Sequence, residues 1–109
     1  MATVKSQART FRAVFKEVIT YQGTLNLGDA ATGSGTFASS DVTVPGASLG
    51  DFVVVSLGID TVDAAVVGAV TAANTVTVTL LNNTAGAVNL DSTTVRIAVL
   101  KPAPDAFFA

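Results

Sequence analysis

The sequence predicts an all-β protein, a single antiparallel β-sandwich or jelly-roll-like domain with an extended or partly helical N-terminal arm. Three observations support this fold class. A chain of 109 residues suits one domain of ordinary size. It contains 17 valines and 15 threonines, β-branched residues that pack well on a pleated sheet. Short alternating segments also follow one another at intervals of about ten residues, separated by turn residues.

The first element is a basic N-terminal arm, predicted over residues 1–22. Residues 1–16 contain four of the six basic residues and no acid, so they carry +4, and the remaining two bases and eight acids give residues 17–109 a charge of −6. From Phe11 to Ile19 the apolar residues have helical spacing. Several of them also favour strands, so a helix and an extended arm both remain open. The chain is therefore a basic arm on an acidic body.

The sandwich domain is predicted over residues 23–101. Its expected strands are 23–27, 35–44, 51–58, 65–72, 75–81 and 94–100. The clearest is 75–81 (TVTVTLL), where Val76, Val78 and Leu80 alternate with threonines. Turn residues lie between the strands, notably Pro45-Gly46 and Ala73-Asn74.

A C-terminal tail is predicted over residues 102–109 (PAPDAFFA). Its two prolines cannot continue a central strand. The aromatic pair Phe107-Phe108 is left exposed unless something covers it. This pair is therefore a candidate for contact with a partner.

The composition leaves little room for catalysis. The chain has no histidine and no cysteine, which removes the usual general base, thiol nucleophiles and common zinc ligand sets. Residues 46–50 (GASLG) match the G-x-S-x-G nucleophile elbow, but a strand pattern follows Ser48 where that motif needs a helix, and the sequence places no lysine near it. We therefore interpret this segment as a loop between strands and predict no enzymatic activity.

Other ligand and partner classes are also disfavoured. Residues 28–35 (GDAATGSG) have the glycine spacing of a phosphate loop, but Ser34 stands where that loop has a lysine. Asp60 and Asp63 could contribute to a calcium site, but they lack EF-hand spacing. No cofactor or metal is therefore predicted. The acidic body disfavours nucleic acid. The uncharged run 64–90 alternates and contains several asparagines, which disfavours a membrane span, and the N-terminus lacks the apolar core of a secretory signal.

The body of the chain resembles a known family. The segments DVTVPGASLGDFVVVSLG (41–58) and ANTVTVTLLNNTAGAVNLDSTTVRIAVLK (73–101) resemble small β-sandwich structural proteins of tailed bacteriophages, in particular capsid decoration (cement) proteins. The resemblance covers roughly residues 35–100. It is carried by Pro45, Gly46, Gly50, Asp51, Asn74, Thr75, Val76 and Arg96.

The resemblance implies a virion protein that is made in the host cytoplasm and located on the capsid surface. Its expected partners are the major capsid protein and further copies of itself, as a homotrimer. Residues of the arm and tail are our candidates for contact with the shell or a neighbouring protomer: Lys5, Arg9, Phe11, Arg12, Phe15, Lys16, Phe107 and Phe108.

Two other virion roles and one enzymatic role remain as alternatives. One is a minor structural protein of the neck or tail. Another is a fibre-associated module that binds a receptor or carbohydrate, which the single tyrosine and the lack of tryptophan disfavour. The third is an esterase that uses Ser48.

Overall fold

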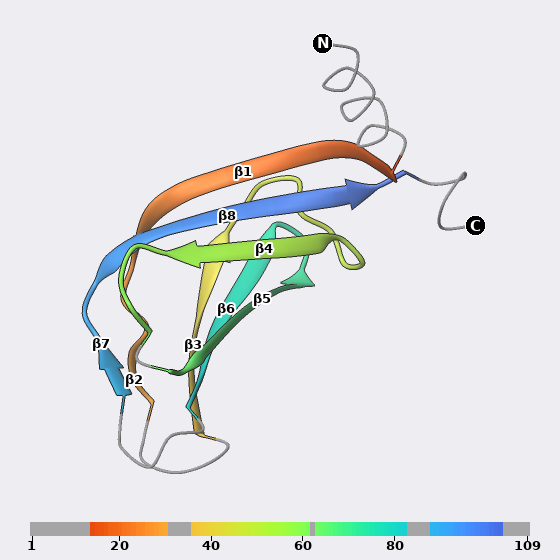
Figure 1. Ribbon diagram of the computed structural model, residues 1–109. Coiled ribbons are helices and arrows are strands. Elements are labelled where there is room, and N and C mark those ends of the chain that lie inside the picture. The colour runs from red at the N-terminus through yellow and green to blue at the C-terminus, as the bar shows by residue number, and fades with distance from the viewer. Residues whose placement is uncertain (1–13, 31–35, 62, 83–87, 104–109) are drawn as a thin grey trace.

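Two three-stranded antiparallel sheets form the body of the protein (Figure 1). The computed structural model describes residues 14–30, 36–61, 63–82 and 88–103. Sheet 1 has the order β1 (Phe15–Leu25), β8 (Thr93–Pro102), β4 (Phe52–Leu57). Sheet 2 has the order β3 (Thr36–Thr43), β6 (Thr75–Asn82), β5 (Ala65–Ala72). The predicted all-β class is confirmed, and the two sheets are compatible with a β-sandwich.

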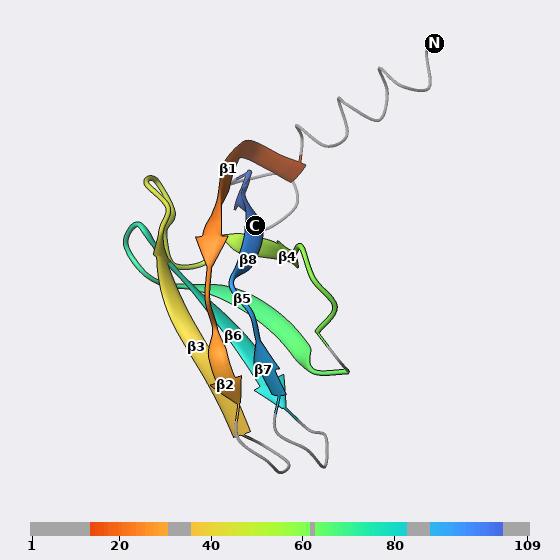
Figure 2. The ribbon, with the colours of Figure 1, turned by 90° about the vertical axis from the view of Figure 1, so that its left-hand side faces the viewer.

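A short ribbon extends sheet 1. It consists of β2 (Gly28–Ala30) and β7 (Val88–Leu90), which pair in antiparallel fashion. β2 follows β1 and β7 precedes β8, so the ribbon continues this pair of strands beyond a bend and lies beside β3 (Figure 2). Part of the chain thus passes from one layer of the fold towards the other.

The core lies between the two sheets because each sheet turns alternate residues inward. In β6 every second residue is buried, and Val76, Val78 and Leu80 are completely inaccessible. On the inner face of β8, three more residues are buried in the same core: Val95, Ile97 and Val99. Burying one such side chain contributes about 1.5–3 kcal/mol, so the two central strands supply much of the stability.

The sheets approach most closely where β5 passes β4. A Cβ atom placed on Gly68 would lie 2.9 Å from Cγ1 of Val53 and would collide with Cγ2 of Val55. A glycine at this position therefore lets the backbone of β5 lie directly against the valines of β4.

Five predicted strands agree closely with β3, β4, β5, β6 and β8, whereas the short strands β2 and β7 are not predicted and the predicted strand 23–27 overlaps the end of β1. β1 begins at Phe15 and pairs with β8, so residues 15–22 of the segment predicted as an arm form a strand of sheet 1. Ile19 and Tyr21 explain this, since both pack against the core. Residues 1–13 of the predicted arm and 104–109 of the tail lie outside the described residues.

Within the part of the chain that the structure describes, no helix is long and apolar enough to cross a membrane.

Candidate interaction surface

The loop 45–51 (PGASLGD) connects the two sheets through two consecutive turns. The N–H of Ala47 donates to the carbonyl of Val44 at 3.1 Å, and the N–H of Asp51 donates to the carbonyl of Ser48 at 3.1 Å. Gly46 and Gly50 occupy the third position of the two turns, each with φ of 94°. A positive φ at this position is characteristic of type II turns and favours glycine. The two glycines of the G-x-S-x-G string are therefore explained by turn geometry.

The fold brings a lysine to Ser48, which the sequence did not predict. Nζ of Lys101 lies 3.4 Å from Oγ of Ser48, but it lies only 2.7 Å from Oδ2 of Asp51. The same Asp51 oxygen accepts the N–H of Ser48 at 2.9 Å. A lysine that donates to a carboxylate as an ammonium has no lone pair with which to accept a serine proton. This geometry supports a structural role, in which the ion pair of Lys101 and Asp51 connects the loop to β8.

The same loop is also fastened to sheet 2. Asn74, in the two-residue turn between β5 and β6, accepts the N–H of Gly46 through Oδ1 at 2.8 Å. Its backbone carbonyl accepts the N–H of Val44 and its N–H donates to the carbonyl of Ala47, both at 2.8 Å. The loop 45–51 is therefore bound both to β8 of sheet 1 and to the β5–β6 turn of sheet 2.

Of the loop 28–35, residues 31–35 lie outside the described residues. Asp60 and Asp63 flank the undescribed residue 62, and Asp63 has φ of 67°. Among the described residues, no three potential ligands of the His, Cys, Asp and Glu types gather in one place.

The surface most suited to binding is the outer face of sheet 1, the side turned away from sheet 2. The strand register sets its side chains in three rows across the strands. The first row is Val18, Leu100 and Phe52; the second is Thr20, Ala98 and Val54; the third is Gln22, Arg96 and Ser56. None of the described elements covers this face (Figure 1).

The first two rows are unusually apolar for an exposed face. Val18, Phe52 and Val54 are 42%, 45% and 57% exposed. Phe15 extends the apolar area, because its ring packs edge-on against Phe52 with the ring centroids 5.7 Å apart. The register of β1 shifts at Lys16, between Phe15 and Glu17, and this irregularity lets Phe15 reach Phe52.

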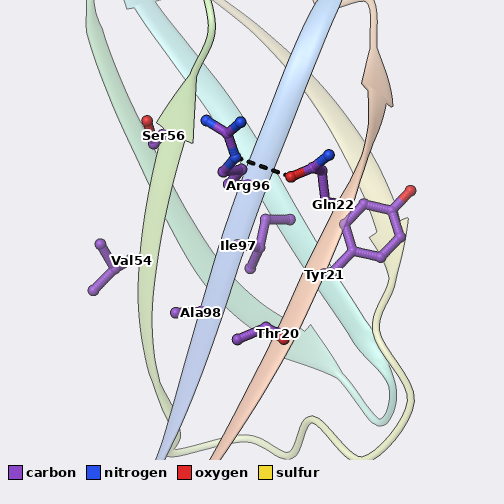
Figure 3. A pocket seen from close by; sticks show the side chains of 8 residues that line it. All are labelled: Thr20, Tyr21, Gln22, Val54, Ser56, Arg96, Ile97 and Ala98. Carbon is purple, nitrogen blue, oxygen red and sulfur yellow. Dashed lines mark hydrogen bonds between the residues drawn. The ribbon is translucent and has the colours of Figure 1, made fainter.

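A hollow of about 330 Å³ opens on this face (Figure 3). Its walls come from all three strands, and Ala98 leaves space between its larger neighbours along β8, Arg96 and Leu100. At one end Nε of Arg96 donates to Oε1 of Gln22 at 2.9 Å, which fixes the guanidinium across the face (Figure 3). The hollow is thus a mainly apolar depression with one cation at its end.

The outer face of sheet 2 has a different character. The hydroxyl of Thr77 donates to Oδ1 of Asp41 at 2.7 Å and lies 2.8 Å from the hydroxyl of Thr71. Among the residues of this sheet whose burial is described, the large apolar side chain that is exposed is Val67, at 57%. The hydroxyl and carboxylate groups make this face more hydrophilic than the outer face of sheet 1.

Two of the predicted contact residues lie beside this surface. Phe15 and Lys16 begin β1, and Phe15 pairs with Pro102 at the end of β8. The other predicted contacts lie outside the described residues: Lys5, Arg9, Phe11, Arg12, Phe107 and Phe108. Sequence reasoning missed Phe52 and Val54. The signal for them is the segment 52–55 (FVVV). Its four consecutive apolar residues place apolar side chains on both faces of the strand.

Comparisons with known proteins identify no relative of this chain. No family model matches it. No curated protein and no solved structure matches it at a significant level.

Proposed function

We propose that this protein is a structural component of a tailed bacteriophage particle that decorates the capsid and stabilises it by bridging subunits of the major capsid protein. The sandwich is then a jelly-roll-like scaffold, and the terminal segments make the contacts with the shell. The proposal starts from the resemblance of residues 35–100 to phage decoration proteins and is supported by the position of the chain ends.

The observation that carries the proposal is that both ends of the described chain lie together. Phe15 pairs with Pro102, and the N–H of Ala103 donates to the carbonyl of Val14 at 2.8 Å. Figure 1 shows β1 and β8 running side by side to this end of sheet 1. The basic segment that precedes β1 and the aromatic segment that follows β8 are therefore attached at one place.

This arrangement suits a protein that bridges two neighbours. The N-terminal segment offers the cations of Lys5, Arg9 and Arg12, and the C-terminal segment offers Phe107 and Phe108. One segment is thus suited to an acidic surface and the other to an apolar pocket. Two linked contacts reinforce each other, because once one has formed the second occurs at a high effective concentration.

Stabilisation would follow from binding alone. A protein that binds the assembled shell and not its separated subunits shifts the equilibrium towards the shell by mass action. No substrate is converted, which agrees with a chain that has neither histidine nor cysteine.

The experiment compares particles that contain the protein with particles from which its gene has been deleted. We expect the deleted particles to release their DNA at a lower temperature and to regain resistance when purified protein is added. Equal resistance of the two particles would disprove the decoration role.

Copy number locates the protein within the particle. Quantitative mass spectrometry should find on the order of hundreds of copies, because a capsid contact repeats with the symmetry of the shell. A number close to that of a neck or tail protein would overturn the capsid assignment and favour a neck, tail or fibre position.

A further inference from the structure

We infer that the C-terminal segment 104–109 folds back on the outer face of sheet 1, so that Phe107 and Phe108 cover its first row of side chains. This segment follows the described part of the chain. The contact lies within one molecule, so it goes beyond the proposed function and does not depend on where the protein acts.

The outer face of sheet 1 is suited to an apolar occupant. Val18 on β1 is 42% exposed and Val54 on β4 is 57% exposed. A strand with one face in water normally alternates apolar with polar residues, whereas the segment 52–55 (FVVV) has the pattern of a strand covered on both faces. Covering these side chains would remove apolar surface from water, which is favourable.

The tail begins beside this face. Phe15 pairs with Pro102, and the N–H of Ala103 donates to the carbonyl of Val14 at 2.8 Å. Leu100, which belongs to the first row, precedes Ala103 by three residues, a distance of about 10 Å along an extended strand. The chain therefore leaves the sheet close to the apolar row.

The residues that follow favour a reversal of the chain. Pro104 has no N–H and cannot continue the pairing with β1. A proline followed by an aspartate, as in Pro104-Asp105, is typical of a β-turn. The loop 45–51 lies against Lys101 on the inner side of the sheet at this end. A segment that turns back therefore finds room on the outer side.

The two rings are within reach of the first row. A turn over residues 103–106 would bring Phe108 back by about 7 Å along β8, and its side chain can span the remaining distance to Leu100. The hollow around Ala98 lies about 17 Å from Ala103, which is the limit for five fully extended residues. The first row is therefore the expected contact, and there the rings can add to the edge-on pair of Phe15 and Phe52.

Charge favours the tail over the basic arm as the occupant. Arg96 lies on the same face, where its Nε donates to Oε1 of Gln22. Residues 1–13 contain three bases and no acid, so they would be repelled by this guanidinium. Residues 102–109 contain no base and one acid, Asp105. The tail thus brings apolar rings to the face without adding a like charge.

Only a weak contact is needed to hold the tail in place. A short linker keeps two groups of one chain at an effective concentration on the order of 1 mM. A contact with a dissociation constant of about 1 mM between separate molecules would therefore be about half formed within one chain. Two aromatic rings on an apolar row are suited to a contact of at least this strength.

A spin label tests where the tail lies, because the natural chain has no cysteine to compete for it. With a nitroxide on Ala109→Cys, the methyl signals of Val18 and Leu100 in NMR spectra should be broadened more than those of Val67. Val67 is the matched control, since it is 57% exposed but lies on sheet 2. Adding Phe107→Ser and Phe108→Ser to the labelled chain should restore the signals of Val18 and Leu100. Equal broadening of the three residues, or none, would disprove the proposal.

Thiol reactivity measures the cover of the first row without a label on the tail. The reaction of Val18→Cys with a bulky maleimide should be about twofold or more faster once Phe107 and Phe108 are replaced with serine. Val67→Cys should react at one rate in both backgrounds. Equal rates for Val18→Cys in the two backgrounds would contradict the contact. Equal melting temperatures of the backgrounds would show that both are folded.

The same measurement distinguishes other occupants of the face. If Phe11→Ser releases the thiol of Val18→Cys and the serine replacements in the tail do not, the basic arm covers the face and the proposal is wrong. Protection that increases with protein concentration would point to a second copy and would also overturn it. All these measurements use the isolated protein, so the tail contact can fail while decoration of the particle holds, and the reverse. On a particle, contact of Phe107 and Phe108 with the shell would replace their contact with the sheet.

Discussion

The carboxylate of Asp51 lies 2.7 Å from the ammonium of Lys101, and both side chains are nearly buried, at 7% and 13% exposure. The pair ties the beginning of β4 to the end of β8, next to the backbone pair of Phe52 and Leu100. The same loop is hydrogen-bonded to Asn74, in the turn between β5 and β6 of sheet 2, so these polar contacts connect the two sheets at this end of the fold.

Removing the charge of Asp51 should destabilise the protein strongly. In the variant Asp51→Asn, Lys101 keeps its charge in a nearly buried position without a counter-ion, and breaking such a pair costs about 3–5 kcal/mol. We expect the free energy of unfolding, measured by urea denaturation, to fall by an amount near the lower end of this range. The reason is that Lys101 can still reach Oγ of Ser48.

The double variant Asp51→Asn/Lys101→Met separates the pair from its surroundings. It should be more stable than Asp51→Asn alone, since no unpaired charge remains. Asp91→Asn, at an exposed position before β8, is the control and should change stability by less than about 0.5 kcal/mol. If all three variants had the same stability, the ion pair would have no structural role.

Two substitutions of Asn74 should separate its backbone role from its side-chain role. Asn74 has φ of 61° and accepts the N–H of Gly46. Asn74→Gly tolerates the positive φ but loses the side-chain acceptor, which should lower the free energy of unfolding by about 1 kcal/mol. Asn74→Ala loses the same acceptor and also strains the backbone, which should lower it by roughly a further 1 kcal/mol or more. In thermal denaturation, the melting temperature should be highest for the natural protein, lower for Asn74→Gly and lowest for Asn74→Ala. The opposite order of the two variants would contradict this account of the turn.

Gly68→Ala should be destabilising because there is no room for a methyl group between the sheets. The new Cβ would meet Val53 and Val55, and such overpacking costs about 1–3 kcal/mol. Gly50→Ala is the comparison: nothing lies within 4 Å of its Cβ position, so only backbone strain from φ of 94° contributes.

Shortening Val55 distinguishes steric overlap from a general effect of alanine. Val55→Ala should lower the free energy of unfolding less in the Gly68→Ala variant than in the natural protein. The reason is that the shorter side chain makes room for the new methyl group. Additive losses measured in a double-mutant cycle would argue against the close approach of β4 and β5.

The sequence predicted most strands because their signals are local. Residues 75–81 alternate strictly, and the structure places β6 at Thr75–Asn82 with alternate residues buried. The start of β1 was not predicted, since the spacing from Phe11 to Ile19 fits a helix as well as a strand. Pairing with β8 decides the conformation from Phe15 onward, and that contact joins residues about eighty positions apart, beyond the reach of a local pattern.

The candidate surface was harder to predict than the fold. The sequence singles out Phe15 and Lys16 as contact residues, but for Phe52 and Val54 it predicts only a strand. Their exposure depends on which face of β4 meets sheet 2, and both faces are apolar. The proximity of Lys101 to Ser48 was equally hidden, because it arises from the antiparallel register of β4 and β8.

Ser48 should make no contribution to ester hydrolysis. Lys101 donates to Asp51, and Ser48 lies in a tight turn whose N–H is held by the same carboxylate. Hydrolysis of p-nitrophenyl acetate by the natural protein should equal that by Ser48→Ala. A serine-dependent rate above this background would revive the esterase interpretation.

Binding to the shell should depend on salt if the basic arm provides one of the contacts. Raising the salt concentration from about 0.1 M to about 1 M shortens the electrostatic screening length from about 10 Å to about 3 Å, which should weaken rebinding to particles stripped of the protein. Replacing Lys5, Arg9, Arg12 and Lys16 with glutamine should weaken rebinding at low salt and remove most of its salt dependence. Lys16, the one of the four within the described residues, is exposed, so its replacement should change stability little. Asp91→Asn, which alters a charge on the body, is the control and should bind as the natural protein does. Salt-independent rebinding of the natural protein would show that the arm's charges do not contact the shell.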